Sequence, residues 1–118
     1  MEAKPAERYQ LQERAAFQIA AGLPIPVLMV GPSQQILFVN PAAEQFFGMG
    51  AGLLIRHGLS DIVPFSSPII QLMDQARERN ASVGERDMDL STPKHGERIA
   101  DVIVTPVAEP EGAVLVTL

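Results

Sequence analysis

Two histidines and a few aspartates are the side chains of this sequence best able to do chemistry. His57 immediately precedes Gly58, and His95 lies in a polar segment before Gly96, so both are predicted to occupy solvated turns. A haem site would need an axial histidine on a helix that lines a pocket, and neither position fits that requirement. The histidines also lack the neighbouring acidic or thiol ligands of a zinc site. The sequence therefore predicts no metal ligand and no haem ligand.

The aspartates carry the next strongest signal. Asp87 and Asp89 are two residues apart, which would place both carboxylates on one face of a strand, where a metal ion or a catalytic pair could use them. Such alternation is more often the solvated side of an edge strand. The serines lack a G-x-S-x-G context, and the glycine-rich segment 48–52 lacks the lysine and spacing of a phosphate loop. No catalytic residue is predicted, and this chain is not expected to be an enzyme.

Composition limits the remaining classes of function. The chain has 118 residues, of which 47% are hydrophobic and 19% charged, as expected for one globular domain. It contains no cysteine, which excludes disulfides, thiolate metal sites and a flavin that photoreacts through a cysteinyl adduct. The net charge of −5 disfavours nucleic acid and anionic membranes as direct partners. No membrane-spanning run or secretory signal is found in the sequence, so a cytoplasmic location is expected.

Apolar periodicity and turn residues divide the chain into predicted elements. Helices are expected over residues 7–21, 42–47 and 68–79, with a short helical turn over 59–63. Strands are expected over residues 27–30 and 36–39, around Met88 and Leu90, and over 99–107 and 113–118. The glycine-rich segment 48–52 is expected to be irregular. Two strands before the helices and three after them predict an α+β fold: one five-stranded antiparallel sheet with helices packed on one face.

The predicted ends of two helices rest on specific residues. Asn40 and Ser67 each stand immediately before a proline, which makes them predicted N-caps with proline at the first helical position. Asn40 could instead contact a ligand from its strand-to-helix junction, but the cap is the favoured interpretation. Asn80 is predicted to close the helix 68–79 because asparagine tolerates a left-handed conformation.

This order of elements resembles a PAS domain, and two segments strengthen the resemblance. "ILFVNPAAEQFFG" (36–48) resembles the PAS segment in which a strand passes into the first core helix, and "LSDIVPFSSPI" (59–69) resembles a later short helix and connector. The resemblance implies a PAS domain over residues 23–118, preceded by a flanking helix over residues 1–22. None of the motifs is specific by itself, and the resemblance rests on their combination.

More narrowly, the chain is similar to the sensory domain of the nitrogen-regulation sensor histidine kinases. Three segments carry this similarity: "LPIPVLMVGPSQQILFVNPAAEQFF", "PFSSPIIQLMDQARERNASV" and "LSTPKHGERIADVIVTPVAEPEGAVLVTL". It implies a dimeric two-component sensor whose C-terminal kinase core autophosphorylates a histidine, phosphorylates a response regulator and answers to a PII-type signalling protein. No segment here resembles the phosphoacceptor helix or the ATP-binding boxes. The chain is therefore expected to be an excised sensory region, with a complete small PAS protein as the alternative.

PAS domains also include receptors for flavin, haem or a small metabolite, which is the alternative function. A cavity in this domain would be lined by apolar residues of the strands and helices. These candidates are Leu28, Phe38, Phe46, Phe47, Ile69, Met73 and Val102. Core side chains pack densely, so the favoured interpretation is that these residues fill the interior and that no cofactor is bound.

Two apolar surfaces remain without a predicted cover. One is a stripe on the N-terminal helix, and the other is the outer face of the last strands, where a sheet wetted on one side should be polar. These surfaces could cover each other within one chain or across a two-fold dimer. The kinase resemblance favours the dimer. Its candidate interface residues are Tyr9, Leu11, Ala15, Ala16, Ile19, Ala20, Ile99, Ile103 and Leu115.

Overall fold

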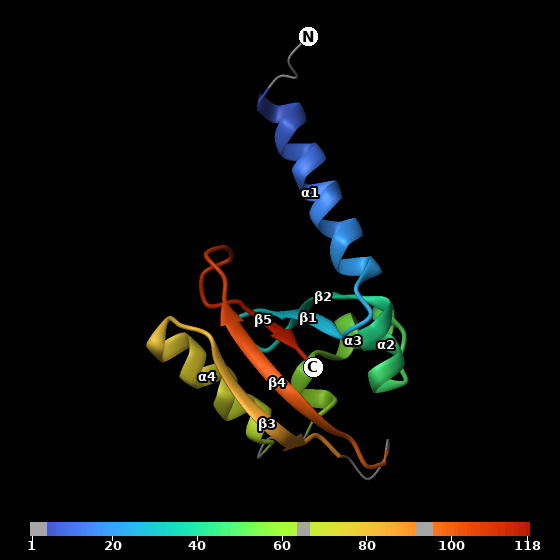
Figure 1. Cartoon of the computed structure of the whole chain (residues 1–118), viewed down its shortest axis with the longest axis vertical. Helices are drawn as coiled ribbons and strands as arrows, with labels where there is room; N and C mark the ends of the chain where they lie inside the picture. Colours follow the sequence, from blue (N-terminus) through green and yellow to red (C-terminus); the bar gives the residue numbers. More distant parts are fainter. Residues whose placement is uncertain (1–4, 64–66, 92–95) are drawn as a thin grey trace.

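The fold is built on a five-stranded antiparallel sheet of order β2-β1-β5-β4-β3 (Figure 1). The computed structural model describes residues 5–63, 67–91 and 96–118, with side chains described from residue 14 onward. The strands are β1 (Val27–Val30), β2 (Ile36–Val39), β3 (Val83–Asp89), β4 (Ile99–Pro106) and β5 (Val114–Thr117). The first two strands and the last two were predicted almost to the residue, and β3 extends further toward the N-terminus than its apolar pattern indicated. The predicted five-stranded antiparallel sheet is therefore confirmed.

Short helices cover one face of this sheet (Figure 1). They are α2 (Pro41–Phe47), α3 (Ala51–His57), the 3-10 helix η1 (Leu59–Asp61) and α4 (Pro68–Arg79). The core lies between this layer and the sheet, where Leu54 and Met73 from the helices meet Val102 and Val116 from the strands. All four side chains are almost completely buried. Apolar burial between the two layers is what holds the domain together.

The first helix stands apart from this arrangement. Helix α1 (Pro5–Gly22) projects away from the sheet as a separate arm (Figure 1), and the molecule is correspondingly elongated, with extents of 56 × 31 × 24 Å. The predicted flanking helix is confirmed. Pro24 and Pro26 follow it directly and prevent its continuation.

The predicted cap at Asn40 is confirmed in detail. Its side-chain oxygen accepts a hydrogen bond from the Ala43 amide at 2.9 Å, and Pro41 occupies the first helical position of α2. Gly48 ends the helix in a left-handed conformation with φ of 66°, which glycine adopts without steric cost. These local signals fix both ends of a helix only seven residues long.

The glycine-rich segment 48–52 was expected to be irregular, and that prediction was wrong for its second half. Helix α3 begins at Ala51, whose amide donates to the Glu44 carboxylate of α2 at 3.0 Å. Leu54 is fully buried and anchors the helix on the core. Tertiary burial and a carboxylate from the preceding helix therefore override the low helix propensity of Gly52.

Ser67 only partly fulfils its predicted role. It occupies the N-cap position of α4, with Pro68 following, but its hydroxyl makes no capping hydrogen bond and has no partner in the structure. At the other end, Asn80 closes α4 in the left-handed conformation, with φ of 49°, as predicted. The proline thus marks the start of α4 without help from the serine side chain.

A β-bulge interrupts β3 near its middle. Glu85 pairs with Val102 and Met88 with Ala100, so β3 has one residue more than β4 over this stretch. Asp87 takes a positive φ of 53°, and its amide donates to the Asp101 carboxylate at 3.0 Å. Strand β3 lies at the edge of the sheet. After the bulge, Met88 is buried on the core side.

Candidate interaction surface and interior

Strand β4 carries apolar side chains on both faces, as its sequence predicts, although Asp101 stands between Ile99 and Ile103 on the outer one. Val102 and Val104 are fully buried beneath the helices, whereas Ile99 and Ile103, which point the other way, are 54% and 53% exposed. A sheet face that meets water normally carries polar side chains. The exposed isoleucines therefore mark the outer face of the sheet as a candidate interaction surface.

The strand register extends this surface across the sheet. Met29 of β1 pairs with Phe38 of β2 on one side and with Leu115 of β5 on the other. All three side chains are partly exposed and point away from the core. We define the outer sheet surface as the apolar set on this face. Its members are Phe38, Met29, Leu115, Ile103 and Ile99.

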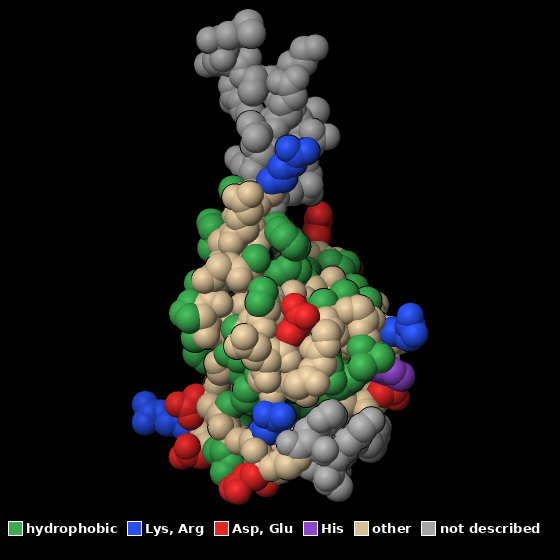
Figure 2. All heavy atoms as spheres, turned by 90° about the vertical axis from the view of Figure 1, so that its right-hand side faces the viewer, with side chains coloured by type: hydrophobic (Ala, Val, Ile, Leu, Met, Phe, Trp, Pro, Cys, Tyr) green, Lys and Arg blue, Asp and Glu red, His purple; other side chains and the backbone are tan. Residues whose placement is uncertain are grey.

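Helix α1 meets this surface within the chain only at its Phe38 end. Phe17 and Ile19 of the helix are 60% and 66% exposed, and Ala15 and Ala16 are exposed beside them, while Ala20 at the base is half-buried. Figure 2 shows hydrophobic side chains at the base of α1, where it joins the globular part. The structure therefore leaves most of both apolar surfaces uncovered in the described chain, and the intrachain cover weighed from the sequence is limited to the contact between Phe17 and Phe38.

Two candidate interface residues, Tyr9 and Leu11, have side chains outside the described residues. Conversely, Phe17 was missed, because it falls between the positions of the four-residue stripe. Its ring packs edge-on against Phe38, with 5.6 Å between the centroids. Its aromatic side chain could have identified Phe17 as an interface candidate from the sequence, since aromatic residues dominate interface energetics.

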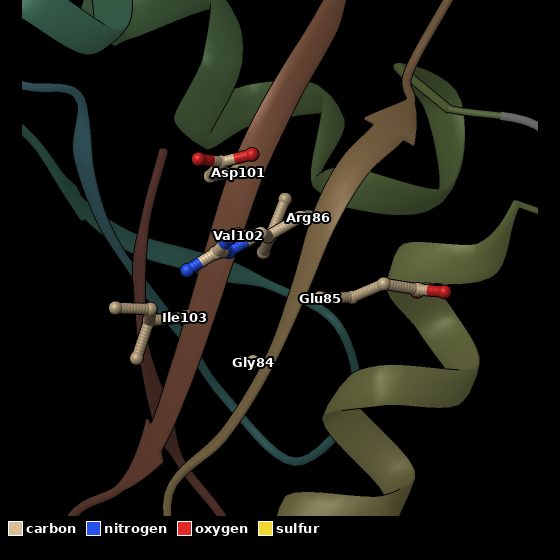
Figure 3. Close-up of a pocket in the computed structure, with 6 residues that line it drawn as sticks. All are labelled: Gly84, Glu85, Arg86, Asp101, Val102 and Ile103. Carbon is tan, nitrogen blue, oxygen red and sulfur yellow. The ribbon is translucent and has the colours of Figure 1, made fainter.

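A shallow hollow lies on the outer face between β3 and β4 (Figure 3). Gly84 supplies no side chain, and Ile103, Asp101 and Arg86 surround the space, which has a volume of about 290 Å³. Glu85 points away from it, toward α4 (Figure 3). The hollow is a dent in the outer face and lacks the enclosure typical of a small-molecule site.

The residues named as candidate cavity lining divide into two groups. Five of them belong to the core cluster, and Phe46 is partly buried against it, in a T-shaped pair with Phe47 at 5.1 Å between centroids. This group consists of Leu28, Phe46, Phe47, Ile69, Met73 and Val102. Phe38 lies on the opposite, outer face of the sheet, because Leu37 is an extra residue in a bulge of β2 and shifts the alternation.

The polar candidates do not assemble into a site. His57 is exposed, and its Nδ1 lies 3.7 Å from an Asp61 carboxylate oxygen, while His95 lies outside the described residues. The Asp89 side chain is also exposed, and hydrogen bonds from Ser91 hold the pKa of its carboxyl below the usual value. Within residues 5–63, 67–91 and 96–118, no three metal-binding side chains gather in one place, and no helix is both long and apolar enough to cross a bilayer.

Comparison with known proteins identifies the fold. Residues 13–118 match the model of the PAS fold, and the chain belongs to this family. The PAS domain of nitrogen regulation protein NR(II) from Vibrio parahaemolyticus superposes with a TM-score of 0.73 at 22% identity, covering 85% of this chain and 92% of that one. The fold expected from the sequence is thereby confirmed.

Curated relatives are more specific. The chain is 41% identical over 92 residues to the sensory histidine kinase/phosphatase NtrB of Rhizobium meliloti (strain 1021), which covers 77% of this chain and 24% of that protein. It is 39% identical over 103 residues to NtrB of Rhizobium leguminosarum bv. phaseoli, covering 86% and 27%. The chain thus spans about a quarter of the length of these relatives, and the predicted similarity to nitrogen-regulation kinases is confirmed.

Proposed function

We propose that this chain is the regulatory sensory and dimerisation module of a nitrogen-regulation histidine kinase of the two-component class. The similarity to NtrB proteins over most of the chain carries the proposal. The structure supports a role in interaction, because Ile99 and Ile103 are exposed on the outer sheet face and Ile19 is exposed on α1. Within the described residues the polar side chains form no catalytic constellation, which fits a domain that regulates chemistry performed elsewhere.

The proposed partner of the two exposed surfaces is a second copy of the same chain. Ile99, Ile103 and Leu115 on the sheet, together with Ala15 and Ile19 on α1, would be buried in a two-fold dimer. Burying exposed aliphatic side chains contributes about 25 cal/mol for each Å² removed from water. Two uncovered surfaces on one chain match this arrangement, because in a two-fold dimer α1 of each chain can pack against the sheet of the other.

The remaining partners belong to the longer protein. In this proposal a C-terminal kinase core autophosphorylates a histidine, passes the phosphoryl group to a response regulator and responds to a PII-type signalling protein, all in the cytoplasm. The module would act by passing a conformational change to that core, which requires two states whose balance the input shifts. The similarity to NtrB proteins does not favour the alternative role as a flavin, haem or metabolite receptor.

A chimera tests the regulatory role. This chain would replace the matching segment of Rhizobium meliloti NtrB, and autophosphorylation and its control by a PII-type protein would be measured beside the parent kinase and a deletion of the segment. We expect the chimera to retain control that the deletion loses. A chimera as unregulated as the deletion, although folded and phosphorylated, would contradict the proposal.

A further inference from the structure

Asn40 is the one asparagine of the described chain that is completely buried, and its side chain uses its full hydrogen-bonding capacity. The Oδ1 atom accepts from the amides of Val27 and Ala43, each at 2.9 Å. The Nδ2 atom donates to the carbonyl oxygens of Ala20 at 2.9 Å and Ile25 at 2.8 Å. A helix cap requires only the bond to Ala43, so the other three contacts need a separate explanation.

These partners fix which way the amide group points. Two amide N–H groups face one atom of the side chain, and two carbonyl oxygens face the other, so the reversed orientation would oppose donors to donors and acceptors to acceptors. The two ends of the amide therefore have distinct roles. The oxygen joins the start of β1 to the start of α2, and the nitrogen holds the last turn of α1 and the linker that follows it.

Few apolar contacts hold the C-terminal end of α1 and the linker after it, so the hydrogen bonds of Asn40 are the main contacts there. Leu23 and Ile25 in the linker are both exposed, and Phe17, itself 60% exposed, packs against Phe38 in a T-shaped pair. The linker also accepts a backbone hydrogen bond from Leu118 at Pro26, so β5 ends beside the same linker. A rigid planar amide that bonds to α1, β1 and α2 at once is well placed to set their relative directions.

We infer that Asn40 is a joint that fixes the direction in which α1 leaves the sheet, and that its Nδ2 contacts couple α1 to α2. It is a positioning residue, and the inference concerns a single chain, so it stands whether or not the chain dimerises or regulates a kinase. A change in the position of α2 would redirect α1 through this amide. Without the Nδ2 contacts, α1 would remain helical but lose its fixed direction.

Distance measurements between spin labels test the joint. The chain has no cysteine, so Gln18→Cys on α1 and Gln75→Cys on α4 place labels at two exposed sites, and dilution with unlabelled chain removes distances between copies. Asn40→Ser is the test variant, because its hydroxyl can still cap α2 but is too short to reach the Ala20 and Ile25 carbonyls. We expect a narrow distance distribution for the parent and loss of that narrow peak for Asn40→Ser.

Leu54→Ala is the matched control, since it weakens the core in α3 without touching α1. We expect it to keep the narrow peak. A narrow peak in Asn40→Ser, or equal broadening in Leu54→Ala, would overturn the inference, because α1 would then be held by other contacts or would follow overall stability.

A measurement on the unaltered chain decides the matter if Asn40→Ser fails to fold. The side-chain N–H protons of Asn40 should exchange with solvent much more slowly than those of exposed Gln71. Slow exchange of both protons would support the inference that Asn40 Nδ2 holds α1 and the linker. Exchange as fast as that of Gln71 would overturn it, however the variants behave.

Discussion

Phe17 of α1 meets Phe38 of β2 edge to face, with 5.6 Å between the ring centroids. This contact covers one end of the outer sheet surface and leaves the other end, at Ile99 and Ile103 of β4, open to solvent. The helix therefore touches the sheet at β2 and projects away from the rest of it (Figure 1). Its exposed face and the open end of the sheet are available to a second chain at the same time.

The core between the helices and the sheet should be sensitive to cavities. Met73 on α4 is fully buried, so Met73→Ala should lower the free energy of unfolding by about 2–5 kcal/mol. Gln71→Ala on the exposed side of the same helix should change it by less than about 0.5 kcal/mol. Urea denaturation followed by circular dichroism measures both. Equal effects would show that α4 does not pack as described.

Two glycines should respond to alanine in opposite ways. Gly112 has a φ of 84°, and a Cβ there would lie 2.8 Å from the Pro32 side chain, so Gly112→Ala should destabilise the fold by about 1 kcal/mol or more. Gly52 lies in α3 with open space around it, so Gly52→Ala should stabilise the fold by about 0.5–1 kcal/mol. Thermal melting temperatures would report the two signs. A loss of stability at Gly52 would contradict the helical assignment of this segment.

Arg77 joins two loops at one end of the sheet. Its guanidinium donates to the Gly112 carbonyl at 2.8 Å and to the Gly31 carbonyl at 3.0 Å. Lysine cannot present two donors in this planar arrangement, so Arg77→Lys should cost about 1–3 kcal/mol of stability. Arg79→Lys, at an exposed position on the same helix, serves as the control and should be neutral. If denaturation midpoints of the two variants coincide, the loops are held by other contacts.

Local signals in the sequence were sufficient for much of the fold. The Asn40–Pro41 pair predicted the start of α2, and the apolar stripe of α4 predicted its buried face, because caps and helical periodicity depend on neighbours in the chain. The two-faced apolar pattern of β4 likewise predicted the exposed isoleucines. These features need no knowledge of distant residues.

The features that sequence reasoning missed depend on contacts between different helices and strands. Helix α3 starts at Ala51 because the Glu44 carboxylate of another helix accepts its amide bond. Phe38 faces outward because a bulge at Leu37 shifts the register of β2 against β1. The bonds from Asn40 to the root of α1 join residues 15 and 20 positions apart, and no local pattern indicates them. Register and long-range hydrogen bonds are set by tertiary packing, which periodicity does not report.

The molar mass of the chain in solution tests the proposed dimer most directly. Sedimentation equilibrium should give twice the 12.7 kDa of one chain, and Ile103→Glu should reduce the mass to that of one chain because a charge would be buried at the interface. Gln71→Glu adds the same charge on the helical side and should leave the dimer intact. A parent chain that sediments as a monomer, or an Ile103→Glu variant with the mass of the parent dimer, would contradict the account.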